Sequence, residues 1–272
     1  MKHFQNINAY MLAGGKSSRM GQDKGLMPLR GKPLAGYVLD ALKPCFEHIA
    51  IVTDNPAYRV FGFEAIPDAL KNLGPAGGIY TALRHSTVGL NLVVSCDMPF
   101  ITPKLVQWLV SEALLSNAEI TLPKTEKGFE PLFAVYSQAV LPQLAQLLDG
   151  GMVKLQNIVS CFNYKALPAP PGPALSNLNT PHHFETAQQY ITQQMSITIL
   201  AFGQTAEATG APQFAIDETV KDTNHLKALL EQRFPALANM QYALALNTGL
   251  VTQNTPINPP ATVALLPPFS GG

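Results

Sequence analysis

Residues 7–24 read INAYMLAGGKSSRMGQDK, a short apolar run that passes directly into a turn rich in glycine and basic residues. The apolar run has the length and composition of a buried strand. Further apolar runs at 48–52 and 91–95 alternate with helical patterns at 37–42 and 77–84. This alternation predicts an α/β domain with a mostly parallel, doubly wound sheet. A helix is also predicted at 103–117, with Thr102 as its N-cap and Pro103 at its first position.

The glycine-rich turn after the first strand is the first candidate binding element. Glycine lets backbone N–H groups approach an anion closely, and Arg19 and Lys24 would add fixed positive charge beside it. The spacing is neither that of a Walker loop nor that of the Gly-x-Gly-x-x-Gly motif. A nucleotide-binding loop and an ordinary turn between strand and helix both fit these residues.

Asp97 is the second candidate, because it lies two residues after the apolar run at 91–95. Open α/β sheets bind ligands at the carboxyl ends of their strands, and a carboxylate there suits Mg²⁺ bound to phosphates. An Asp that caps the following turn is the other interpretation. Cys96 beside it is interpreted as a small buried residue rather than a nucleophile.

Taken together, the two motifs resemble those of the molybdenum cofactor guanylyltransferase family. They read LAGGxSxRMGxDK at 12–24 and CDxP at 96–99. Further similar segments are IPD at 66–68, LGPAGG at 73–78, EPLFAVY at 130–136 and NLNTP at 177–181. The resemblance therefore covers nearly all of residues 1–190.

This resemblance implies a Rossmann-like nucleotidyltransferase domain that transfers GMP from GTP to the terminal phosphate of molybdopterin and releases pyrophosphate. Nucleotide contacts are then expected from Leu12, Ala13, Gly14, Gly15, Arg19, Lys24, Thr53 and Asp68. Asp97 would hold Mg²⁺, and Asn177 and Asn179 would contact the pterin. Such a transfer needs positioning and charge neutralisation rather than a Ser, Cys or His nucleophile. Similar enzymes that use CTP read LAAG at the first turn, so Gly14 and Gly15 favour guanine.

After residue 194 the chain appears to begin a second domain. Residues 195–202 alternate like a half-buried strand, and a helix at 223–234 and strands at 242–246 and 261–266 follow. We therefore predict two domains, residues 1–194 and 195–272. The chain closes on Gly271 and Gly272, which fits either a frayed terminus or a slender reactive tail.

The second domain resembles the small subunit of molybdopterin synthase, a β-grasp, ubiquitin-like sulfur carrier, from 197–202 to the closing LLPPFSGG at 265–272. The resemblance implies that Gly272 carries sulfur as a thiocarboxylate, after activation by an adenylating enzyme, to a catalytic large subunit. The alternative is a nucleotidyltransferase for CTP or another substrate, with a tail domain that only regulates it or docks partners.

The composition limits which partners and which cellular location can be expected. The 272 residues carry 18 basic and 18 acidic side chains, so the chain lacks the positive charge that nucleic-acid binding needs. Three widely spaced cysteines fit neither a disulfide framework nor a zinc site, and no leader or membrane-spanning run is evident. A cytoplasmic protein that binds neither nucleic acid nor membrane is expected.

Overall fold

The computed structural model describes residues 3–14, 23–178, 180–218 and 220–268. Its contacts divide the chain into two compact units, residues 1–184 and 185–272. Helix α6 (Pro181–Met195) crosses this division. The predicted join at residue 194 falls at the end of that helix and stays a prediction.

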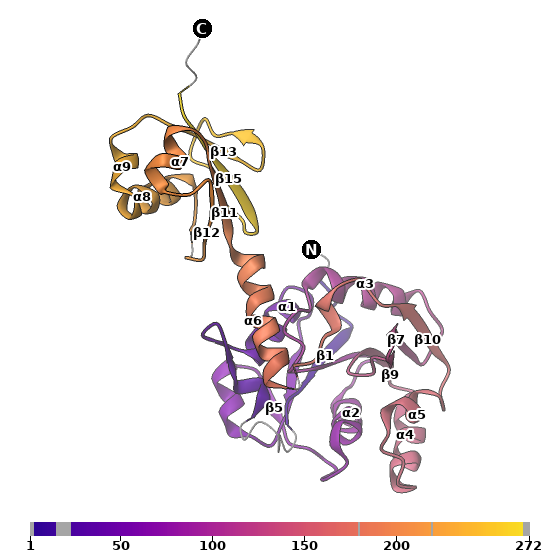
Figure 1. The fold of residues 1–272 in the computed structure, drawn as a ribbon. Coiled ribbons are helices and arrows are strands. Elements are labelled where there is room, and N and C mark those ends of the chain that lie inside the picture. The colour runs from indigo at the N-terminus through magenta and orange to yellow at the C-terminus, as the bar shows by residue number, and fades with distance from the viewer. Residues whose placement is uncertain (1–2, 15–22, 179, 219, 269–272) are drawn as a thin grey trace. The chain divides into compact units, whose positions relative to one another are not determined.

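The first unit is built on a mostly parallel sheet (Figure 1). In its described residues the sheet has eight strands, with seven in the order β10-β7-β9-β6-β1-β4-β5 and β8 paired with β7. The strands are β1 (Ile7–Leu12), β4 (Ile49–Val52), β5 (Glu64–Ile66), β6 (Leu90–Ser95), β7 (Ile120–Thr125), β8 (Gly128–Phe129), β9 (Phe133–Ser137) and β10 (Tyr164–Pro168). Strand β1 pairs in parallel with both β4 and β6, whereas β9 is antiparallel to β6 and β7.

Helices cover both faces of this sheet, as Figure 1 shows. Side chains alternate along β1, so Ala9 and Met11 pack on one face and Tyr10 packs on the other. The first face is covered by α1 (Leu34–Leu42) and α3 (Pro103–Leu114). The second is covered by α2 (Gly74–His85), α4 (Val140–Asp149) and α5 (Leu155–Val159). The predicted doubly wound α/β architecture is confirmed.

Short elements complete the first unit at its loops. Strands β2 (Pro28–Leu29) and β3 (Lys32–Pro33) form a small hairpin. Three 3₁₀ turns lie at η1 (Lys24–Leu26), η2 (Pro56–Phe61) and η3 (Pro173–Leu175). The predicted helix cap at Thr102 is present, because its hydroxyl accepts a hydrogen bond from the backbone N–H of Leu105 at 3.2 Å.

The second unit is a small mixed sheet in the order β12-β11-β15-β13-β14. Its strands are β11 (Ile197–Ala201), β12 (Gln213–Ile216), β13 (Ala243–Leu246), β14 (Gly249–Leu250) and β15 (Ala261–Leu266). Its helices are α7 (Gln204–Thr209), α8 (Thr223–Arg233) and α9 (Pro235–Ala238). The first and last strands, β11 and β15, are parallel neighbours, and Leu226 and Leu230 of α8 pack into their core. This unit has its own hydrophobic core.

None of the helices in the described residues combines the length and the apolar character needed to cross a membrane.

Candidate active site

The carboxyl ends of four strands lie in one row at one edge of the first sheet. Leu12, the last residue of β1, is in register with Val52 of β4 and with Ser95 of β6. Val52 is in turn in register with Ile66 of β5. The chain runs from β1 outward through β4 to β5 and then crosses back to β6, so the strand order reverses beside β1. This reversal is where open α/β sheets form ligand crevices.

The turn after β1 leaves the sheet between its two neighbours. The N–H of Ala13 donates to the carbonyl of Val52 at 2.9 Å, and the N–H of Cys96 donates to the carbonyl of Leu12 at 3.0 Å. Gly14 has a φ of 155°, and open space surrounds the position that a Cβ would take. Glycine is therefore favoured at position 14 by the backbone conformation, and not by a close contact with other described residues.

Lys24 and Asp97 face each other at this edge. The Lys24 Nζ lies 3.8 Å from Asp97 Oδ2, and the two side chains are 23% and 13% exposed. The Ser95 hydroxyl donates to Asp97 Oδ1 at 2.6 Å, while the Asp97 carbonyl accepts from the N–H of Leu178 at 3.0 Å. The structure thus joins the two predicted motifs, which are 73 residues apart in the chain, in one half-buried ion pair.

Asp23 forms a second polar centre directly before Lys24. Its Oδ1 accepts from the Tyr58 hydroxyl at 2.6 Å and from the N–H of Gly25 at 3.1 Å. Its Oδ2 accepts from the Asn55 amide at 2.9 Å. Both carboxylate oxygens are therefore held by protein donors.

Thr53 directly follows β4, and Asp68 lies two residues after the end of β5. Thr53 is buried, and its hydroxyl accepts from the N–H of Asn55 at 3.1 Å. Asp68 Oδ1 accepts from the Thr81 hydroxyl at 3.4 Å. Burial and the negative charge of Asp54 raise the pKa of Asp68, although Thr81 and Lys71 oppose this shift.

Asn177 lies near this edge, because the N–H of the next residue, Leu178, donates a hydrogen bond to the Asp97 carbonyl. Its buried Oδ1 has no hydrogen-bond partner among the described residues. Five predicted site residues lie outside the described residues: Gly15 and Arg19 in the loop, Asn179, and the terminal Gly271 and Gly272. Their predicted roles stay predictions.

The side chains at this edge are suited to a metal that phosphates also bind. In the described ranges no three His, Cys, Asp or Glu side chains converge to form a metal cluster. Asp97 is instead a single, partly exposed carboxylate, which suits Mg²⁺ held mainly by phosphate oxygens and water. The residues present therefore fit a nucleotide-bound Mg²⁺ rather than an all-protein metal cage.

The similarity of this chain to a known family and to known relatives decides its enzyme class. Residues 9–163, more than half of the chain, match the family profile of the MobA-like NTP transferase domain. A probable molybdenum cofactor guanylyltransferase of Flavobacterium johnsoniae is 36% identical over 163 residues, which are 60% of this chain and 85% of that relative. One from Natranaerobius thermophilus is 31% identical over 68% of this chain and 97% of its own.

The chain belongs to the molybdenum cofactor guanylyltransferase family. It is therefore a nucleotidyltransferase. A solved structure agrees: the molybdopterin-guanine dinucleotide biosynthesis protein A from Archaeoglobus fulgidus is 27% identical, with a TM-score of 0.60, and covers 70% of this chain and 98% of its own. Residues 199–272 match the ThiS family, which identifies the second unit as the predicted β-grasp domain.

In this guanylyltransferase, several residues that hold the predicted site residues in place were not predicted from the sequence. Ser95, Asp23, Asn55 and Tyr58 were not predicted. Asp23 carried a signal, since it directly precedes Lys24 in the opening motif. Tyr58 carried none, because only the fold brings it from the segment after β4 to the start of η1.

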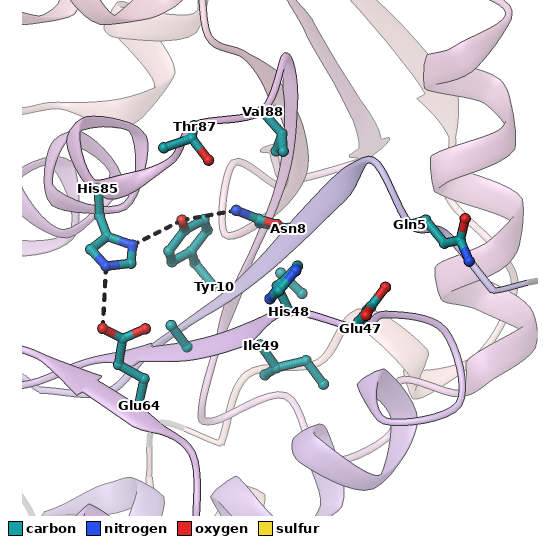
Figure 2. Close-up of a pocket in the computed structure, with 12 residues that line it drawn as sticks. Gln5, Asn8, Tyr10, Glu47, His48, Ile49, Glu64, His85, Thr87 and Val88 are labelled. Carbon is teal, nitrogen blue, oxygen red and sulfur yellow. Dashed lines mark hydrogen bonds and ion pairs between the residues drawn. The ribbon is translucent and has the colours of Figure 1, made fainter.

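The guanylyltransferase unit also has a cavity of about 540 Å³ at the opposite edge of its sheet. Figure 2 shows a row of polar contacts there: Glu64 lies at ion-pair distance from His85, and hydrogen bonds continue from His85 through Tyr10 to Asn8. Glu64 begins β5, His85 ends α2, and Asn8 and Tyr10 lie along β1. Of the predicted site residues that the structure describes, none lines this cavity. The chemistry is therefore assigned to the carboxyl edge, where the strand order reverses.

Proposed function

We propose that residues 1–194 transfer GMP from GTP to the terminal phosphate of molybdopterin, in its metal-free or molybdenum-bearing form, with release of pyrophosphate. The observation that carries this proposal is the Lys24–Asp97 pair at the reversal of strand order. A cation and a carboxylate at that point suit a nucleoside triphosphate with its Mg²⁺. The family supports the same substrates through the names of the relatives above.

The proposed step is an in-line displacement at the α-phosphorus of GTP. A phosphate oxygen of molybdopterin forms the new P–O bond, and the bond from the α-phosphorus to the bridging oxygen breaks. The electron pair leaves on pyrophosphate. No covalent nucleophile is needed. Cys96 is unsuited to that role, because burial and the neighbouring Asp97 raise the pKa of its thiol to about 12.

Each predicted residue then has a defined part in the proposed step. Lys24 and Arg19 would neutralise the triphosphate, and Asp97 would hold Mg²⁺. Bound Mg²⁺ supplies charge neutralisation of the phosphates. The Ser95 hydroxyl orients the Asp97 carboxylate by donating to Oδ1, which leaves Oδ2 toward Lys24.

The remaining contacts concern the base and the pterin. We propose that Leu12, Ala13, Gly14 and Gly15 hold the guanine and phosphates, and that Thr53 and Asp68 lie along the nucleotide. Asn177 and Asn179 would contact the pterin. The buried Asn177 Oδ1 supports this role, because an acceptor left without a donor is costly and a pterin N–H could supply one.

The substrate assignment can be tested with the purified protein, Mg²⁺ and molybdopterin, supplied separately with GTP or CTP. Pyrophosphate release and the mass of the pterin product would both be measured. We expect release with GTP and a product enlarged by GMP. Preference for CTP would overturn the guanine assignment, and no release with either nucleotide would overturn the proposed reaction.

We further propose that residues 195–272 carry sulfur as a thiocarboxylate on Gly272. The ThiS family match supports a carrier of this kind. Its partners would be an adenylating enzyme, which activates the terminal carboxylate, and the large subunit of molybdopterin synthase. We also propose a cytoplasmic location, in keeping with a family of biosynthetic nucleotidyltransferases.

Deletion of Gly271 and Gly272 tests the carrier role separately from the transferase. We expect the shortened protein to lose sulfur transfer to the large subunit and to retain pyrophosphate release with GTP. Retained sulfur transfer would refute the carrier role and favour a domain that only regulates the enzyme or docks partners.

A further inference from the structure

The turn that carries Lys24 is surrounded by side chains that hold it in place. Lys24 opens the short turn η1, and Asp23 is the N-cap of that turn. A turn of three residues is too short to be stable by itself, since it has few internal hydrogen bonds. The position of Lys24 must therefore depend on contacts made by its neighbours.

Two caps are bonded to each other at this point. Asn55 caps η2, because its Oδ1 accepts from the N–H of Ala57 at 3.0 Å, and its amide nitrogen donates to Asp23 Oδ2 at 2.9 Å. Asn55 is itself tied to Thr53 at the end of β4. A continuous set of contacts thus runs from β4 through Asn55 and Asp23 to Lys24, which meets Asp97 after β6.

Tyr58 makes a further contact with Asp23. Its side chain is fully buried, and its hydroxyl donates to Asp23 Oδ1 at 2.6 Å. Burial, with the hydrogen bond to the Asp23 carboxylate and its negative charge, raises the pKa of Tyr58 well above its ordinary value. The hydroxyl therefore keeps its proton, and its bond to Asp23, throughout the working pH range.

Gly25 shows how closely η1 sits on Tyr58. A Cβ at Gly25 would lie 2.1 Å from the Tyr58 hydroxyl oxygen and 2.9 Å from Cys96 Sγ. Only glycine fits there without displacing one of them. The backbone that carries Lys24 is therefore pressed between Tyr58 and the residue that precedes Asp97.

We propose that Tyr58 is a positioning residue for nucleotidyl transfer: its hydroxyl holds Asp23 and thereby fixes Lys24 opposite Asp97. Tyr58 itself does not reach the substrate, because it is fully buried. The inference rests on the proposed role of Lys24 at the triphosphate. Asn55 acts in the same way on the other Asp23 oxygen.

The test is Tyr58→Phe, which removes one oxygen atom and keeps the ring that packs near Phe61. Tyr10→Phe is the matched control. Tyr10 is also buried and its hydroxyl is hydrogen-bonded, but it lies at the opposite edge of the sheet (Figure 2). Any general effect of deleting a buried hydroxyl should appear equally in both variants.

Two readouts distinguish positioning from simple loss of structure. We expect kcat with GTP to fall about tenfold in Tyr58→Phe, as expected for loss of one hydrogen bond, and to stay near wild type in Tyr10→Phe. The second readout needs no turnover: reductive methylation of Lys24, followed by peptide mass spectrometry, should become severalfold faster in Tyr58→Phe only.

A double variant shows whether the effect passes through Asp23. In an Asp23→Asn background, Tyr58→Phe should lower kcat much less than it does in the wild type. Equal labelling of Lys24 in the wild type and Tyr58→Phe would overturn the inference, whether or not GTP is turned over. Failure of the wild type to turn over GTP, with altered Lys24 labelling in Tyr58→Phe, would instead overturn only the proposed reaction.

Discussion

At the residue scale, the site depends on charges that are only partly removed from water. Lys24 and Asp97 remain 23% and 13% exposed, so both can exchange their mutual contact for contacts with a ligand. Ser95 and the N–H of Leu178 hold Asp97 from two sides. The carboxylate is therefore preorganised but not closed off, as a phosphate and metal site requires.

Asp97→Asn keeps the size of the side chain and removes its charge. We expect guanylyl transfer to fall at least about a hundredfold, because charge stabilisation at the reacting phosphates is the main contribution in this chemistry. Pyrophosphate release across a Mg²⁺ titration measures the effect. Asp149→Asn, at the exposed end of α4, is the control and should match the wild type. Full activity of Asp97→Asn would refute the metal assignment.

Asp68→Asn should make the protein more stable at neutral pH. Burial and Asp54 raise the pKa of Asp68, so its ionised form opposes folding. The stability associated with its protonated form is present at acid pH and is lost as the pH rises above about 4, through the raised pKa. The difference in unfolding temperature between variant and wild type should therefore be positive at pH 7 and shrink toward pH 4. A difference independent of pH would contradict this account.

At the scale of elements, a local sequence signal marks where helix α3 begins. Thr102 and Pro103 start α3 as predicted, because the Thr102 hydroxyl accepts from the N–H of Leu105 and proline needs no donor at the first position. Helix α3 then packs Val106 and Leu109 into the core between the sheet and α1. The Thr102 cap therefore supports a helix that packs on one face of the first sheet.

Thr102→Ala should lower the free energy of unfolding by about 0.5–2 kcal/mol, the usual cost of losing a cap hydroxyl. Thr102→Ser keeps a hydroxyl at the same atom position and should stay within about 0.5 kcal/mol of the wild type. Denaturant titration of both variants measures the difference. Equal loss in the two variants would show that the hydroxyl is not the source of stability.

At the scale of the molecule, two units have separate hydrophobic cores. The core of the second unit includes Ile199, Leu230 and Val263, and the cores of the first unit lie on the two faces of its sheet. Because each core is formed by residues of its own unit, each unit should unfold in a transition of its own.

Leu230→Ala tests this separation, since Leu230 is fully buried in the second unit. The cavity should destabilise that unit by about 2–5 kcal/mol and leave the unfolding of the first unit and its guanylyl transfer unchanged. Leu250→Ala, at a side chain 60% exposed on β14, is the control and should have little effect. Scanning calorimetry, with activity assays in parallel, would measure the unfolding of each unit. A single transition in which both units unfold together at a lower temperature would contradict the separation.

The sequence by itself determined the architecture and the chemical class of this protein. Apolar runs of strand length alternate with helical patterns, and that periodicity is local enough to read without a structure. The motifs at 12–24 and 96–99 carried the family resemblance, and the family comparison bears it out. Asp97 could be chosen because it closely follows a strand end, and Lys24 because it is the basic residue that ends the glycine-rich motif at 12–24.

Only the tertiary structure decided which side chains support those residues. Tyr58 and Asn55 meet Asp23 because η2 folds back beneath η1, a contact between segments more than 30 residues apart that no local pattern encodes. Likewise, Ser95 becomes a support for Asp97 through side-chain geometry rather than through its place in a motif. Periodicity and propensity act over a few residues, whereas positioning depends on register and packing across the sheet, which form only when the chain is folded.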